Sequence, residues 1–166
     1  MKKDTFITGL FSGILLSAVL GVGIAYTAPD AMPPLNELPQ LLNILMGDMS
    51  IIGPRPQTRR CFDAFPTSSQ AEIVKVRPGL SGIGSIVFRD EEGLMHASEA
   101  PERFYDEVIM PYKGALEEWY VAHQGLGTYV LAIFVTAWVV LFPASRLAWR
   151  VFPGLPSAPP ALAGSV

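Results

Sequence analysis

The chain has 166 residues, of which half are apolar and 16% are charged, and its mean hydropathy is +0.35. A chain of this length is expected to form one domain with a modest core, and the mean hydropathy makes a membrane protein the first class to consider. The formal net charge of −3 gives no basic surplus, so we expect no nucleic-acid partner. With Cys61 as the one cysteine and only His96 and His123 as histidines, the sequence predicts neither a disulfide nor a zinc site.

The first apolar segment comes after Lys2 and Lys3 and runs from Thr5 to Ala28, 24 residues without a charge. This is long enough to cross roughly 30 Å of hydrocarbon as a helix. A signal peptide has the same basic start, but this run is longer than the usual signal core. We therefore predict a membrane segment over residues 1–28 and favour an anchor over a cleaved signal.

Residues 29–124 are more polar, and their first element is a predicted helix after an Asn36 N-cap. Its apolar face consists of Leu38, Leu41, Leu42, Leu45 and Met46, and Gly47 is the predicted stop. Residues 49–52 predict a short extended piece, 68–76 a helix, and 77–82 a loop whose glycines permit positive φ. Residues 83–90 predict a strand, and 100–125 predict two helices broken near Pro111. The expected fold class is α+β, mostly helical.

The second apolar segment covers residues 125–144 and precedes Arg146, Trp149 and Arg150, residue types that anchor a segment at a membrane interface. It could span the membrane, lie in the interface, or dip and return. The tail, residues 145–166, is rich in proline, alanine and glycine and predicts a flexible segment.

Two Arg-Pro turns, GPRP with Arg55 and VRPGLSG with Arg77, are the most specific motifs of the chain. The guanidinium fork suits phosphate oxygens, and a stiff proline backbone lowers the entropy lost on binding. The alternative is that both arginines pair with nearby acids, Asp48, Glu37 or Glu72. Glu37 could instead interact with the helix dipole, and Asp48 could be a turn residue.

Together, LNELPQLLNILMGDMSIIGPRP, VRPGLSGIGSI and PYKGALEEWYVAHQ resemble the bacterial sugar transferases, which are small monotopic phosphoglycosyl transferases. The resemblance covers about Leu35 to Pro143. It implies transfer of a phosphosugar from a UDP-sugar to polyprenol (undecaprenyl) phosphate, with release of UMP, as the first step of polysaccharide or glycan assembly. It also implies a need for Mg²⁺ and a monotopic core that faces the cytoplasm at the bacterial inner membrane. The partners are then a UDP-sugar, the lipid phosphate and the bilayer, and self-association into a homo-oligomer is left open.

The resemblance assigns roles to five residues of this chain. Glu37 and Asp48 are expected to be catalytic and to hold the metal, and Arg55 and Arg77 are expected to bind phosphate. The aspartate that attacks the phosphate adjoining the sugar in the family pattern is replaced here by Asn36. A carboxamide is a far weaker nucleophile and carries no charge to hold Mg²⁺.

Asn36 is open to three interpretations. Glu37 or Asp48 takes over the role of the missing aspartate, the transfer is direct without a covalent intermediate, or the protein is inactive. The family pattern also has a basic, glycine-containing stretch before its acidic pair, whereas only Pro29 to Leu35, with no basic residue, precede Asn36 here. The competing hypothesis is thus a shortened, inactive homologue that acts as a membrane-bound binding or regulatory partner.

The membrane topology predicted from charge conflicts with the cytoplasmic core that the resemblance implies. The lysines at the start and the arginines after residue 144 both favour the cytoplasm. Two full spans would put residues 29–124 outside, away from UDP-sugars. We give the resemblance more weight and expect at least one segment to dip or lie flat.

Overall fold

The computed structural model describes residues 37–143 and 145–163. The chain divides into two compact units, Met1–Leu42 and Asn43–Val166. The predicted N-terminal membrane segment, residues 1–28, and Asn36 lie outside the described residues. The second unit contains both Arg-Pro turns.

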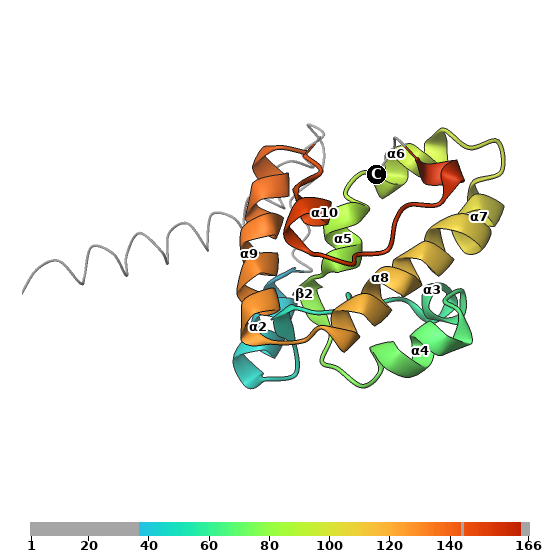
Figure 1. The fold of residues 1–166 in the computed structure, drawn as a ribbon. Helices are drawn as coiled ribbons and strands as arrows, with labels where there is room; N and C mark the ends of the chain where they lie inside the picture. Colours follow the sequence, from blue (N-terminus) through green and yellow to red (C-terminus); the bar gives the residue numbers. More distant parts are fainter. Residues whose placement is uncertain (1–36, 144, 164–166) are drawn as a thin grey trace, which may run out of the picture. The chain divides into compact units, whose positions relative to one another are not determined.

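The described residues form many short helices and one pair of strands (Figure 1), which confirms a mostly helical α+β class. The elements are α2 Glu37–Met46, β1 Ser50–Ile52, α3 Arg59–Asp63, α4 Thr67–Ile73, β2 Gly79–Ser81, α5 Ile83–Val87, α6 Glu91–His96, α7 Pro101–Phe104, a π-helix η1 Tyr105–Ile109, α8 Met110–Ala122, α9 Leu126–Leu141, α10 Leu147–Val151 and a 3₁₀ turn η2 Pro160–Leu162. Among these described elements, no helix is both long and apolar enough to cross a membrane.

Helix α2 ends where the sequence predicts, at Gly47. Gly47 has a φ of 87°, a left-handed conformation that glycine adopts without strain. Its N–H donates to the Ile44 carbonyl at 3.1 Å, and the Asp48 N–H donates to the Asn43 carbonyl at 2.9 Å. This pair of bonds is a Schellman motif, which satisfies the last carbonyls of the helix. The motif also fixes the backbone of Asp48.

The predicted break near Pro111 is a change of helix type and not an interruption. Helix α7, the π-helix η1 and helix α8 succeed one another without a gap. Proline lacks an N–H, so it is best tolerated in the first turn of an α-helix, and Pro111 is the second residue of α8. The looser π turn absorbs the missing bond. The segment is therefore one helical rod.

Residues 83–87 form helix α5, which corrects the predicted strand over 83–90. Ile83, Ile86 and Val87 are buried and have helical spacing, and α5 contacts both α8 and α9. A five-residue apolar piece satisfies helical and strand patterns equally, so its packing decides the conformation.

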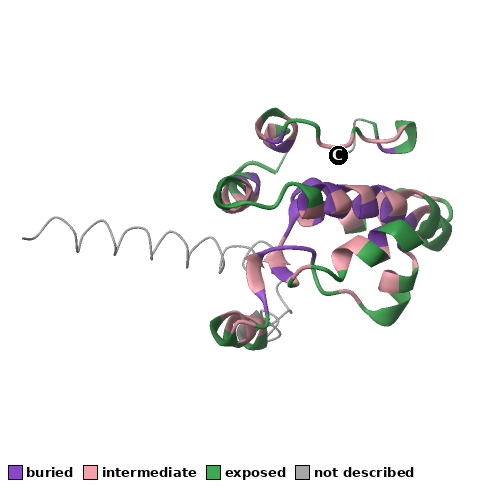
Figure 2. Ribbon diagram, turned by 60° about the horizontal axis from the view of Figure 1, so that its bottom comes forward, coloured by how far each residue is buried: buried purple, intermediate pink, exposed green. Residues whose placement is uncertain are grey.

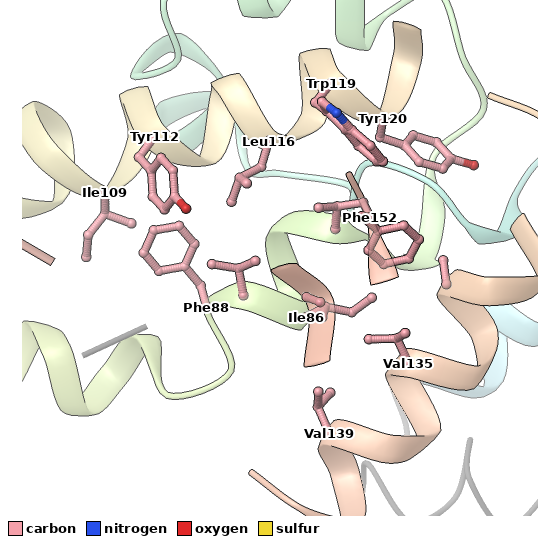
Figure 3. Packing of buried hydrophobic residues seen from close by; sticks show 14 of the residues in the cluster. Ile86, Phe88, Ile109, Tyr112, Leu116, Trp119, Tyr120, Val135, Val139 and Phe152 are labelled. Atoms are coloured by element: carbon pink, nitrogen blue, oxygen red, sulfur yellow. The ribbon is translucent and has the colours of Figure 1, made fainter. Parts of the chain in front are cut away.

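Helix α8 is at the centre of the core, and the buried residues concentrate along it (Figure 2). It packs against α4 and α5. Figure 3 shows Tyr112 beside Phe88 and Trp119 beside Phe152, and in each pair the ring centroids are 5.6 Å apart with an edge-on geometry. Aromatic pairs of this kind add about 1 kcal/mol beyond the area they bury.

The C-terminal segment, which the sequence predicts to be flexible, packs on the core at several positions. Ala148, Phe152 and Leu162 are buried, and the Tyr112 hydroxyl donates to the Pro156 carbonyl at 2.9 Å. In Figure 1 the segment runs along α8 on the side opposite α4. Three apolar residues spread over fifteen positions have no period, so the sequence composition conceals them.

Candidate functional site

The two Arg-Pro turns meet in space. Strands β1 and β2 are parallel, with Ser50 opposite Gly79 and Ile52 opposite Ser81. After β1 the chain bends across the start of β2, where the Gly79 N–H donates to the Pro54 carbonyl at 2.9 Å and the Gly53 N–H donates to the Ser81 carbonyl at 2.8 Å. The GPRP and VRPGLSG motifs are therefore bound directly to each other through their backbones. We call this contact the crossing.

Glycine is required at the crossing because of close approach. A Cβ on Gly79 would lie 2.1 Å from the Gly53 nitrogen, and one on Gly82 would lie 2.3 Å from the Gly53 carbonyl oxygen. Neither Gly79 nor Gly82 is among the positive-φ glycines of the described residues, which are Gly47 and Gly154. The predicted loop over residues 77–82 is therefore wrong for residues 79–81, which form strand β2. Its glycines at 79 and 82 do not have positive φ but admit a neighbouring backbone.

Arg55 and Arg77 leave the crossing on exposed side chains. Of the ion pairs within the described residues, none includes Arg55, Arg77 or Asp48. Glu72, the predicted alternative partner, pairs with Lys75. The structure thus brings the two Arg-Pro turns together, and within the described residues neither arginine is paired with an acid. The Glu37 side chain lies outside the described residues.

Arg77 also lies near the end of α2. Its Nη1 is 3.9 Å from where a Cβ on Gly47 would stand, next to the last carbonyls of the helix, where a cation is favourable. Asp48 comes directly after Gly47 and is exposed. The crossing, Arg77 and Asp48 thus form one neighbourhood within the second unit.

Glu37 is the first residue of α2, and the remainder of that ten-residue helix lies between it and the turn that holds Asp48. Its side chain and Asn36 lie outside the described residues. Their predicted catalytic and metal-binding roles stay predictions.

The donor set suits Mg²⁺ better than zinc. No group of three or more His, Cys, Asp or Glu side chains gathers into a metal site in the described part of the chain. Mg²⁺ is commonly held by one or two carboxylates together with substrate phosphates and waters. An exposed Asp48 near Arg77, which the sequence predicts to bind phosphate, fits that pattern.

A buried charged group next to the crossing escapes sequence reasoning. Glu117 on α8 is 3% exposed, and its Oε1 accepts from the Gly84 N–H at 3.2 Å. Burial raises the pKa of the Glu117 carboxyl to about 7, although the Lys113 ammonium and the Gly84 N–H oppose the rise. Lys113, also buried, donates to Glu91 at 2.7 Å. The signal in the sequence was a lysine and a glutamate four residues apart in a mostly apolar helix, where they share a face.

Helix α9 is tied to both strands by hydroxyl groups. The Ser50 hydroxyl and the Ile51 N–H both donate to the Tyr129 hydroxyl, at 3.1 and 3.2 Å. Ser81 and Thr136 share a hydrogen bond of 3.1 Å. The predicted C-terminal hydrophobic helix is therefore confirmed as a helix and packs one face on the unit that carries the crossing.

A family model described as bacterial sugar transferase matches residues 33–143, which include both Arg-Pro turns and α8. The chain belongs to the bacterial sugar transferase family. Its resemblance to that family in sequence is thereby confirmed.

Curated relatives of this bacterial sugar transferase act on undecaprenyl phosphate or in exopolysaccharide production by name. The UDP-N-acetylgalactosamine-undecaprenyl-phosphate N-acetylgalactosaminephosphotransferase of Aeromonas hydrophila is 46% identical over 55 residues, which are 32% of this chain and 13% of that protein. The exopolysaccharide production protein ExoY of Sinorhizobium fredii is 42% identical over 57 residues, 34% of this chain and 25% of the relative. The undecaprenyl-phosphate galactose phosphotransferase of Salmonella typhimurium is 30% identical over 107 residues, 64% and 19% respectively. This sugar transferase thus spans 13% to 25% of the length of these three relatives.

Proposed function

We propose that this chain transfers a phosphosugar from a UDP-sugar to polyprenol phosphate at the start of a polysaccharide or glycan pathway. A lipid phosphate oxygen becomes bonded to the phosphorus that adjoins the sugar, the phosphoanhydride bond of the UDP-sugar breaks, and UMP leaves with the bridging oxygen. The observation that carries the proposal is the crossing, which joins the backbones of the Arg55 and Arg77 turns in a member of this family.

The two arginines supply the electrostatic part of the chemistry. The diphosphate of the donor and the phosphate of the acceptor are both anionic, and negative charge shifts toward the departing UMP as the phosphoanhydride bond breaks. Guanidinium groups on a rigid backbone stabilise that charge without reorganising. Glu37 and Asp48 are the carboxylates that would hold Mg²⁺, which when bound neutralises the diphosphate charge.

The nucleophile is the open chemical question because Asn36 stands where the family pattern has an aspartate. The transfer is either direct, from lipid phosphate to donor, or passes through a carboxylate of Glu37 or Asp48 that forms a covalent phosphosugar intermediate. Trapping of a radiolabelled sugar phosphate on the denatured protein distinguishes the two routes, because only the covalent route labels the chain.

The decisive experiment is UMP release by the purified full chain in detergent, with a panel of UDP-sugars, polyprenol phosphate and Mg²⁺. We expect release that needs the lipid phosphate and that falls by about 10²-fold in Arg55→Ala, since removal of one charge-stabilising donor has that effect. Arg59→Ala is the matched control, because Arg59 is an exposed arginine paired with Asp63 on α3. Unchanged turnover in Arg55→Ala would rule out its assigned role.

Asn36→Asp complements this test, because it is expected to increase activity at the same site. If the remainder of the site is complete, restoring the carboxylate should raise the rate of UMP release. Absence of UMP release from both the natural chain and Asn36→Asp, with UDP-sugar binding intact, would replace the proposal by the inactive binding partner.

We further propose that the chain binds the cytoplasmic face of the inner membrane through α9. Leu126, Val130, Phe134, Trp138 and Phe142 recur every four residues and expose between 40% and 81% of their surface. The opposite face of α9 packs on the core through Ala132, Val135 and Val139. A helix with one face on protein and one exposed apolar face is suited to lie in the membrane interface, and Arg146 and Arg150 come after it as candidate headgroup contacts.

A further inference from the structure

The start of α5 has no cap of its own. Its N-cap residue is Gly82, which has no side chain to accept a hydrogen bond, and the first N–H groups of a helix need such an acceptor. Glu117 of α8 provides it by accepting from the Gly84 N–H. A residue 33 positions away therefore caps this helix.

The same carboxylate is in contact with the segment that makes the crossing. A Cβ on Gly84 would lie 2.5 Å from Glu117 Oε1, and one on Gly82 would lie 3.5 Å from it. On its other side, Gly82 packs on the Gly53 carbonyl, and Arg55 is two residues beyond. The path from Glu117 to the Arg-Pro turns thus passes only through backbone atoms in direct contact.

Burying a carboxylate costs desolvation free energy unless hydrogen bonds or an ion pair compensate for the lost water. Glu117 Oε2 is buried with no hydrogen-bond partner among the described residues, and Lys113 is engaged by Glu91. An apolar residue here would avoid the desolvation cost but would leave the Gly84 N–H unpaired. The carboxylate therefore serves as the hydrogen-bond acceptor for the Gly84 N–H.

We propose that Glu117 is a positioning residue that holds the Gly79–Gly84 segment against α8 and thereby sets the placement of the Arg55 and Arg77 turns. It does not touch the substrate in this scheme. Its effect on phosphate binding rests on the proposed function, whereas its effect on the segment does not.

The test compares an acceptor with an apolar residue of similar shape. In the full chain, Glu117→Gln keeps an oxygen for Gly84, Glu117→Met removes it, and Glu118→Gln is the matched control, because Glu118 bonds Ser69 of α4 instead. Amide hydrogen exchange over residues 79–88 measures how firmly the Gly79–Gly84 segment is held. The affinity for UDP measures whether the Arg55 and Arg77 turns are correctly placed.

We expect Glu117→Met to speed exchange over residues 79–88 and to weaken UDP binding, each by about tenfold, as the loss of one buried hydrogen bond would. Compared at pH 5, where the natural carboxyl is protonated in the folded state, Glu117→Gln should stay within about twofold of the natural chain in both, and Glu118→Gln should match it. If Glu117 acted through packing alone, Glu117→Met and Glu117→Gln would have the same exchange rates and the same affinity for UDP. Natural exchange in Glu117→Met, or equal damage in Gln and Met, overturns the proposal.

The two proposals fail in different ways. If the natural chain does not bind UDP, the phosphate-binding role of the arginines is wrong, while the exchange comparison still decides the role of Glu117. If Glu117→Met does not fold, Glu117→Leu makes the same comparison, because it also fills the site without an acceptor.

Discussion

At the scale of single residues, the crossing depends on the absence of side chains. Gly53, Gly79 and Gly82 place two backbones in contact, and each belongs to a motif that the sequence singles out for its arginine. The motif pair is thus one structural unit: glycines bring the turns together, prolines stiffen them, and arginines extend to solvent.

Gly79→Ala should separate the two turns. Its Cβ would meet backbone atoms of Gly53 at 2.1 Å, and overpacking of this kind costs about 1–3 kcal/mol of unfolding free energy. Urea denaturation measures the loss. Gly127→Ala on α9 is the control, because nothing lies within 4 Å of its Cβ position, so alanine there should be neutral or stabilising. Equal effects of the two changes would contradict the close approach.

Glu117 makes the stability of the chain depend on pH. Its folded pKa of about 7 lies above the ordinary 4.5, so the folded state binds the proton more tightly than the unfolded state. The contribution of the protonated Glu117 carboxyl to the free energy of unfolding is complete below pH 4.5 and is lost as the pH rises through 7. At about 1.4 kcal/mol per pKa unit, the contribution amounts to roughly 3 kcal/mol.

Glu117→Gln cannot titrate, so it should be increasingly more stable than the natural chain as the pH rises from 5 to 8. Denaturation at several pH values measures this, with Glu118→Gln as the control. The groups that face Glu117 are Lys113 and Tyr120 of its own helix and, through Lys113, Glu91 of α6. Parallel pH curves for Glu117→Gln and the natural chain would show that the buried carboxyl does not titrate in this range.

At the scale of elements, α9 combines two kinds of surface. Tyr129 and Thr136 attach it to the strands, while its other face exposes a stripe of large apolar residues. Sequence hydropathy counts both faces together, so it could not separate a span from a helix that lies on the unit.

Phe134→Asp should weaken binding to vesicles of anionic phospholipid by tenfold or more, because a charge enters the proposed membrane face. Phe134 is 59% exposed, so the fold should tolerate the change. Val74→Asp is the matched control, since Val74 is equally apolar, 67% exposed and outside α9. Co-sedimentation with vesicles measures both. Equal binding of the two variants would exclude α9 as the membrane face.

At the scale of the whole molecule, the C-terminal segment completes the core of the second unit. Phe152 is 2% exposed and packs edge-on against Trp119. Phe152→Ala should therefore cost about 3–5 kcal/mol of unfolding free energy, whereas Arg150→Ala, at an exposed position of α10, should cost little. Thermal unfolding monitored by tryptophan fluorescence compares them. A similarly small loss in both would mean that the segment contributes little to the core.

The sequence by itself determined the features with a local physical cause. Gly47 ends α2 because only glycine readily adopts its φ, residues 126–141 form a helix because the run is apolar and unbroken, and the Arg-Pro motifs mark the family. These features depend on neighbouring residues alone, so a linear pattern is enough to find them.

Only the tertiary structure decided the rest. Residues 83–87 are helical because their contacts with α8 and α9 bury their apolar side chains. In the C-terminal segment, the scattered apolar residues Ala148, Phe152 and Leu162 are buried in the core. The turns of Arg55 and Arg77, which are 22 positions apart, meet through their backbones, and Glu117 meets Gly84, which is 33 positions away. Such pairs have no signature in one sequence, because the backbone contact that creates them exists only after the chain has folded.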